Sequence, residues 1–87
     1  RVLFRSVLEY VSNPKTFIEI IAKQNFQQII ASYCTIEKFS DLNQRMSLNW
    51  KSHLSIFDLI EYFTSNGYAL HKIDDFRNNT ILVFFQK

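Results

Sequence analysis

Apolar and polar positions alternate along this chain with changing period, which predicts helices and strands in alternation. Apolar residues recur at helical spacing from Phe17 to Ala22, directly after Asn13 and Pro14. An asparagine side chain caps a helix, and the fixed φ of proline suits the first helical turn. This pattern predicts a helix over about residues 14–24.

The middle of the chain predicts a strand and then a mostly irregular segment. The short apolar run over residues 28–34 is typical of a strand that is covered on both faces of a sheet. Residues 37–52 are polar and irregular, and only residues 41–46 predict a short helix.

A second main helix is predicted over about residues 55–66. Ser55 is followed three residues later by Asp58, which resembles a capping box at a helix start. Asn66 and Gly67 then supply residues that accept the left-handed conformation at a helix end.

Two further strands are predicted over residues 68–73 and 80–86, with residues 74–79 as a polar turn. The short linker makes these strands an antiparallel hairpin, and the continuous apolar run near the C-terminus belongs in a central strand. The expected order is therefore 28–34, then 80–86, then 68–73, in an α/β fold with a mixed sheet. The other edge of strand 28–34 lacks a partner unless residues 1–6 or a segment outside this sequence fill it. An open apolar edge predicts self-association.

Composition and charge narrow the classes of function. The sequence is 47% hydrophobic and 16% aromatic, which is typical of a globular chain and not of a disordered one. The net charge is +2, but without Arg1 and Arg5 eight basic residues balance eight acidic ones, so we expect no nucleic-acid partner. No apolar run approaches the roughly 20 residues of a membrane span, so we expect no membrane association. The lone Cys34 indicates a reducing compartment, and we expect a cytoplasmic protein.

Three short motifs, in this order, resemble class I methyltransferases that use S-adenosylmethionine. Residues 7–14, VLEYVSNP, resemble the segment after the fourth strand in many small-molecule methyltransferases, with Tyr10 where many relatives carry His. Residues 49–55, NWKSHLS, resemble a Trp-x-x-His-Leu-Ser start of the last helix, and residues 66–68, NGY, match the usual helix stop. The order of elements is also similar to the second half of that fold. The resemblance identifies residues 7–87 as the C-terminal, substrate-side half of such a domain.

Two parts of the chain stand outside this resemblance. Residues 1–6, RVLFRS, resemble the translation of a sequencing adapter, and we expect them to be non-native. Residues 23–26 lack the Lys-Pro-Gly-Gly type of turn that usually precedes the fifth strand, and one glycine in 87 residues allows no glycine-rich cofactor loop. In the family the first half carries that loop. The resemblance therefore implies a methyltransferase with S-adenosylmethionine as cofactor of the intact protein, a small-molecule or saccharide-type acceptor, and a chain that is inactive alone.

The resemblance also places candidate site residues. Glu9 and Tyr10 fall just beyond the fourth strand, where such sheets bind ligands, and are candidates for cofactor binding. Glu9 is equally well explained as a solvated residue near a helix start. His53 is a candidate general base because its imidazole titrates near neutral pH, with local hydrogen bonds ahead of the helix as the alternative.

Tyr33, Arg45 and Trp50 are the candidates for a substrate pocket. Aromatic side chains line pockets for flat acceptors, but they also pack in cores, and packing is favoured for Tyr33. Arg45 has the donors to hold an anionic acceptor, or it forms a surface ion pair with Glu37 or Asp41. No His, Cys and carboxylate pattern has metal-ligand spacing, so we expect no metal.

A different class of function stays open beside the enzyme. A small α/β protein-interaction module would take up a partner strand or helix on the open apolar edge of the sheet. Such a module would explain the edge without any further half of the domain.

Overall fold

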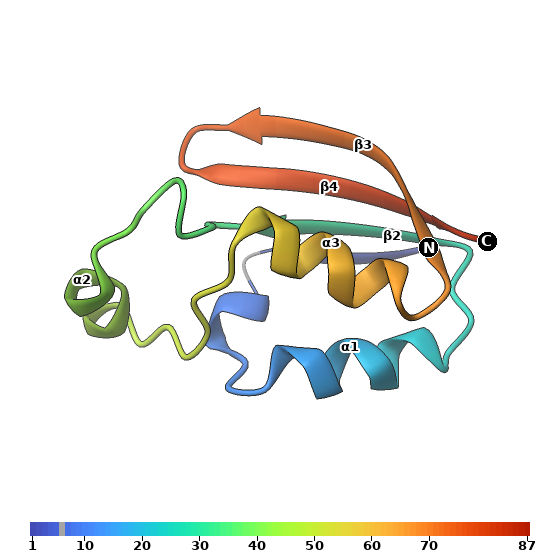
Figure 1. The fold of residues 1–87 in the computed structure, drawn as a ribbon, viewed down its shortest axis with the longest axis horizontal. Coiled ribbons are helices and arrows are strands. Elements are labelled where there is room, and N and C mark those ends of the chain that lie inside the picture. The colour runs from blue at the N-terminus through green and yellow to red at the C-terminus, as the bar shows by residue number, and fades with distance from the viewer. Residues whose placement is uncertain (6) are drawn as a thin grey trace.

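The computed structural model describes residues 1–5 and 7–87, which form one mixed sheet with helices packed on it (Figure 1). The sheet has four strands in the order β1-β2-β4-β3. Its strands are β1 (Val2–Arg5), β2 (Gln28–Tyr33), β3 (Tyr68–Phe76) and β4 (Asn79–Gln86). β1 runs parallel to β2, whereas the β2–β4 and β4–β3 pairs are antiparallel. The predicted α/β class and the predicted order of the last three strands are confirmed.

The helices occupy one side of the sheet and one end of it. α1 (Pro14–Ala22) and α3 (Ile56–Thr64) lie on the same side, and α2 (Leu42–Ser47) lies beyond the end of β2 (Figure 1). A short 3-10 turn, η1 (Leu8–Tyr10), follows β1 at that same end. The carboxyl ends of β1 and β2 therefore face the irregular parts of the chain.

The start of α1 confirms the predicted cap. Asn13 Oδ1 accepts a hydrogen bond from the Thr16 backbone N–H at 3.2 Å, and Pro14 occupies the first turn. The helix ends at Ala22, two residues before the predicted end. The reason lies in the backbone just beyond, where Asn25 has a φ of 57° and cannot continue a right-handed helix.

The capping box predicted for α3 is also confirmed. Ser55 Oγ accepts from the Asp58 backbone N–H at 3.1 Å, and Asp58 Oδ2 accepts from the Ser55 backbone N–H at 3.2 Å. The helix ends at Thr64, and Gly67 then turns the chain with a φ of 92°. Phe63 anchors the helix on the sheet by stacking on Phe84 of β4, with ring centroids 4.4 Å apart.

The hairpin between β3 and β4 corrects the predicted turn over residues 74–79. β3 extends to Phe76, and Asn79 already pairs with it at the start of β4. The turn therefore consists of Arg77 and Asn78, with Arg77 at a φ of 58°. The polar residues misled the prediction because β3 is an edge strand of the described sheet, and an edge strand exposed to solvent tolerates charged residues.

The second edge of strand 28–34 was expected to lack a partner unless residues 1–6 or another segment filled it, and Val2 to Arg5 fill it by pairing with Ile29 to Ser32 as strand β1. The expected coverage of the strand on both faces is wrong: Ile29, Ala31 and Tyr33 are buried under the helices, and the alternate residues are partly exposed. Whether residues 1–6 are non-native stays a prediction, since a short apolar strand pairs in either case.

Candidate functional site

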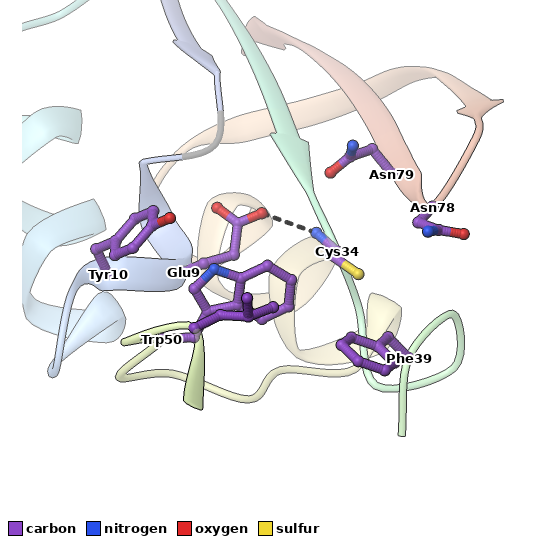
Figure 2. Close-up of a pocket in the computed structure, with 8 residues that line it drawn as sticks. Glu9, Tyr10, Cys34, Phe39, Trp50, Asn78 and Asn79 are labelled. Atoms are coloured by element: carbon purple, nitrogen blue, oxygen red, sulfur yellow. Dashed lines mark hydrogen bonds between the residues drawn. The ribbon is translucent and has the colours of Figure 1, made fainter. Parts of the chain in front are cut away.

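A cavity of about 330 Å³ lies where the carboxyl end of β2 meets η1 and the turn of the hairpin (Figure 2). Segments far apart in the sequence supply its walls. The lining residues are Glu9, Tyr10, Cys34, Phe39, Leu48, Trp50, Asn78 and Asn79. Glu9 and Tyr10 lie on one side of the cavity, and Phe39 and the two asparagines lie on the other.

Glu9 is buried, so its interpretation as a solvated residue is wrong. The residue is only 1% exposed to solvent. Oε2 accepts a hydrogen bond from the Cys34 backbone N–H at 2.9 Å, and Oε1 has no partner within residues 1–5 and 7–87. Burial raises the pKa of this carboxyl, and the hydrogen bond from Cys34 and the charge of Arg45 oppose that rise. Glu9 is thus a weakly solvated acid at the wall of a cavity.

The backbone around Glu9 is fixed by the loop that precedes α3. The Glu9 carbonyl oxygen accepts hydrogen bonds from the backbone N–H groups of Lys51 at 2.7 Å and Ser52 at 3.1 Å. Ser52 Oγ donates to the Leu8 carbonyl oxygen at 2.7 Å. These hydrogen bonds join η1, which carries Glu9, to the loop that carries Trp50, so both side chains line the same cavity.

Tyr33 supports this arrangement from within the core and does not line the cavity. Its side chain is fully buried, and its hydroxyl lies 2.7 Å from Ser52 Oγ. The same hydroxyl accepts a hydrogen bond from the Leu54 backbone N–H at 3.2 Å. The packing interpretation describes its placement, and Tyr33 contributes to the site by fixing the loop.

Arg45 is completely buried, which corrects the surface ion pair expected with Glu37 or Asp41. The two ion pairs of the described residues, Lys38–Asp75 and Lys72–Asp74, do not include it. A guanidinium group has five N–H donors. Those of Arg45 meet His53 Nδ1 at 2.9 Å and the carbonyl oxygens of Thr35 at 3.2 Å, Phe39 at 2.9 Å, Cys34 at 2.9 Å and Ser52 at 3.4 Å. All five donors are used inside the protein, and none is left for an anionic acceptor.

His53 is tied to Arg45 and lies outside the cavity lining. Because Nδ1 accepts from Arg45 Nε, the neutral ring carries its proton on Nε2. Burial lowers the pKa of His53, and the positive charge of Arg45 lowers it further. The geometry supports a neutral imidazole that positions the loop, and the general-base role stays a prediction.

Trp50 both lines the cavity and packs against its neighbours. The guanidinium carbon of Arg45 lies 5.0 Å from the centroid of the Trp50 ring. Phe39 meets the same ring edge to face, with centroids 6.0 Å apart. An indole held on two sides presents a fixed apolar wall, so the two interpretations of Trp50 are compatible.

Five lining residues were missed by sequence reasoning: Cys34, Phe39, Leu48, Asn78 and Asn79. Cys34 ends a predicted strand, and the other four lie in segments predicted as irregular or as a turn; the antiparallel pairing of β2 and β4 brings the hairpin turn beside Cys34. The one signal in the sequence was the pair of asparagines within the predicted turn.

Within residues 1–5 and 7–87, no three His, Cys, Asp or Glu side chains are grouped as a metal site would require. Over the same residues, no helix has the length and apolar character to cross a membrane.

Comparison with known proteins gives matches in structure alone. No protein-family model matches the sequence, and no curated protein matches it. In contrast, solved structures match nearly the whole chain. An O-methyltransferase of neocarzinostatin biosynthesis, solved with S-adenosylmethionine and 2-hydroxy-5-methyl naphthoic acid, has a TM-score of 0.74 at 12% identity over 98% of this chain.

Two further structures give the same result. The magnesium protoporphyrin IX methyltransferase of Synechocystis PCC 6803, with bound S-adenosylhomocysteine, has a TM-score of 0.75 at 14% identity over 98% of this chain. The pyocyanin biosynthetic protein has a TM-score of 0.76 at 11% identity over 99% of it. The chain shares the fold of part of a methyltransferase. It spans 28%, 43% and 30% of these three proteins in turn, so the likeness concerns one portion of a larger fold.

Proposed function

We propose that this chain is the C-terminal part of a methyltransferase that uses S-adenosylmethionine, that its acceptor is a small molecule, and that it is inactive without the remainder of the domain. The observation that carries the proposal is the structural match over 98% of this chain to methyltransferases solved with the cofactor or its product. A second observation agrees, because the cavity lies beyond the carboxyl ends of β1 and β2, where open α/β sheets bind ligands.

Glu9 and Tyr10 are the proposed contacts of this chain with the cofactor. S-Adenosylmethionine carries a positively charged sulfur and, when bound, supplies an electrophilic methyl group. A buried carboxylate and an aromatic face suit such a cation, and Glu9 and Tyr10 offer both at one cavity. The one glycine of this chain, Gly67, lies after α3, so a glycine-rich loop for the cofactor has to come from elsewhere.

The acceptor is proposed to bind against Trp50. Much of the acceleration of methyl transfer comes from holding donor and acceptor in line, which requires a rigid wall more than a reactive group. Arg45 and Tyr33 supply that rigidity from behind by fixing the loop that carries Trp50. His53 is proposed as the base for acceptors that must lose a proton. Nε2 already carries the proton of the neutral ring, so His53 would take up the acceptor's proton at Nδ1, after the hydrogen bond from Arg45 Nε has broken.

The buried free thiol of Cys34 supports a reducing compartment, and we propose the cytoplasm.

The second candidate function is a protein-interaction module, and one observation favours it. The face of the sheet opposite α1 and α3 carries a row of apolar neighbours, Leu3, Ile30 and Val83, and Leu3 is 47% exposed. A second cavity of about 520 Å³, lined in part by Phe76 and Ile81, lies along the same face. Self-association of the chain is proposed to use this face.

Calorimetric titration with S-adenosylmethionine tests the main proposal and separates it from the alternative. The titration compares this chain with the longest polypeptide that contains it. Saturable binding by the longer polypeptide and none by this chain is the expected result. A longer polypeptide that folds but does not bind the cofactor would refute the methyltransferase, and saturable binding by this chain alone would refute its dependence on a second part.

A further inference from the structure

The carboxyl group of Glu9 lies at the wall of the cavity with its two oxygens unequally satisfied. Oε2 accepts a hydrogen bond from the Cys34 backbone N–H at 2.9 Å, whereas Oε1 is buried without a hydrogen-bond partner in residues 1–5 and 7–87. A buried carboxylate stays ionised when several hydrogen bonds or a paired charge replace its hydration. One hydrogen bond replaces little of that hydration, so the surroundings favour the neutral acid, with Oε2 as the accepting carbonyl oxygen and the proton on Oε1.

The charged and titratable groups around Glu9 do not replace a paired charge. Burial raises the pKa of Glu9, and the hydrogen bond from Cys34 and the charge of Arg45 on α2 oppose only part of that rise. The donors of Arg45 are all bound to other acceptors, and neither ion pair of the described residues includes Glu9. From β2 and the residue after it, Tyr33 and Cys34 add no charge near neutral pH, because burial raises the pKa of both. Lys51 joins Glu9 through its backbone N–H, and its side chain is exposed.

A positive charge in the cavity reverses this balance. An opposite charge within about 4–6 Å favours the ionised form of a carboxyl group. Glu9 lines the cavity, and Tyr10 lies on the same side of it with an aromatic ring that also attracts a cation (Figure 2). A neutral ligand of the same shape supplies no such charge and leaves the proton in place. The cavity can therefore distinguish a sulfonium from a thioether through the protonation of one side chain.

We infer that Glu9 is a neutral acid in the empty cavity, releases its proton to solvent when the cavity takes up the sulfonium cation of the cofactor, and regains a proton once the sulfur is a neutral thioether. The identity of the cofactor rests on the proposed function, whereas the coupling of a cation to the proton follows from the cavity. Because binding and proton release are linked, the affinity for a sulfonium rises with pH by up to about ten-fold per pH unit. The rise ends above the pKa of Glu9 in the empty cavity, and the affinity for a thioether does not share it.

The backbone amide of Cys34 reports the protonation of Glu9 directly, because it donates to Glu9 Oε2. Its NMR signal is followed against pH in three samples of this chain: one with sodium chloride, one with trimethylsulfonium chloride at the same concentration, and one with sodium chloride and dimethyl sulfide. In sodium chloride we expect the midpoint of the transition above the ordinary value of 4.5. Trimethylsulfonium should lower that midpoint by at least about 0.5, and the neutral dimethyl sulfide should leave it unchanged.

Two variants assign the transition to its side chain. Glu9→Gln keeps the shape of the side chain and an oxygen that accepts from Cys34, but it cannot ionise, so the Cys34 amide should lose the transition. Glu61→Gln is the matched control, because Glu61 is exposed on α3 and its replacement should change neither the transition nor its response to trimethylsulfonium. Dispersed amide spectra of both variants establish that they are folded before the titrations are compared.

Each result of these titrations decides one part of the inference. A midpoint at or below 4.5 in sodium chloride overturns the neutral acid in the empty cavity. A midpoint that trimethylsulfonium does not move, or that dimethyl sulfide moves equally, overturns the coupling to a cation. A transition of the Cys34 amide that survives in Glu9→Gln overturns the role of Glu9.

Calorimetry of the longest polypeptide that contains this chain separates the inference from the proposed function. Titrations with S-adenosylmethionine and with S-adenosylhomocysteine, each in two buffers of different ionisation enthalpy, measure the protons released on binding. We expect net release with S-adenosylmethionine alone. Cofactor binding without proton release, or with equal release for both ligands, overturns the inference and leaves the methyltransferase intact. A folded polypeptide that does not bind the cofactor refutes the methyltransferase, and the trimethylsulfonium titration of this chain still decides the coupling.

Discussion

Replacing Arg45 with methionine tests whether this one side chain holds the candidate site together. Methionine fills a similar volume but removes the Arg45 donors from four carbonyl oxygens and from His53 Nδ1, and of these the Thr35 carbonyl oxygen keeps backbone donors from Lys38 and Phe39. A buried acceptor that loses its donor costs about 1–3 kcal/mol, and removal of the buried charge offsets part of the sum over these acceptors, so we expect a net loss of roughly 3–5 kcal/mol. A chain of 87 residues has a total stability of roughly 4–13 kcal/mol, so the loss is a large part of it.

Urea unfolding measures this loss with two probes. Trp50 fluorescence reports on the site, because its ring lies against Arg45, and far-ultraviolet circular dichroism reports on the helices and the sheet. Arg45→Lys keeps the charge but not the fork of donors, so we expect it to lose about 2 kcal/mol. Lys15→Met removes an exposed cation from α1 and should change stability by less than about 0.5 kcal/mol. A loss below about 1 kcal/mol in Arg45→Met would refute the account of a fully used guanidinium group.

Three further predictions follow from single side chains. Ser55→Ala removes the capping box of α3 and should lower the free energy of unfolding, measured by thermal unfolding, by about 1 kcal/mol. An unchanged free energy of unfolding would contradict a stabilising role of the cap. The pKa of His53 is lowered, so its contribution to stability is present above the ordinary value of 6.5 and is lost as pH falls through the folded value. His53→Asn should flatten that fall in the urea midpoint, and an unchanged profile would contradict the contact with Arg45. The pKa of Glu9 is raised, so the folded state loses stability as pH rises above 4.5 and through the pKa of Glu9 in the folded chain. Glu9→Gln should therefore be more stable than the unmodified chain at neutral pH, and a less stable variant would contradict the raised pKa.

The local elements of the fold were predictable because their signals are local. The caps at Asn13 and Ser55 act within three residues of themselves, and the sequence shows both partners of each contact. The order of the last three strands followed from the apolar run of β4, which only a central strand explains. The turn of the hairpin was misplaced because polarity marks exposure, and an exposed edge strand is as polar as a turn.

The candidate site was predictable only in part, since its contacts join distant segments. Glu9 and Trp50 were found through motifs, but the burial of Glu9 depends on the backbone of Cys34, which lies 25 residues away. Arg45 reads as a surface residue in a polar segment, and its role arises because the chain folds around it. Four carbonyl groups converge on its side chain, and a carbonyl group is present in every residue, so no sequence pattern marks them.

The measurement that tests the central claim most directly is a structure of the longest polypeptide containing this chain, determined with S-adenosylhomocysteine. We predict that the ligand lies beyond the carboxyl ends of β1 and β2, in contact with Glu9 and Tyr10, and that Trp50 faces the open space beside it. A ligand bound away from this end of the sheet, or a folded polypeptide that does not bind it, would contradict the account.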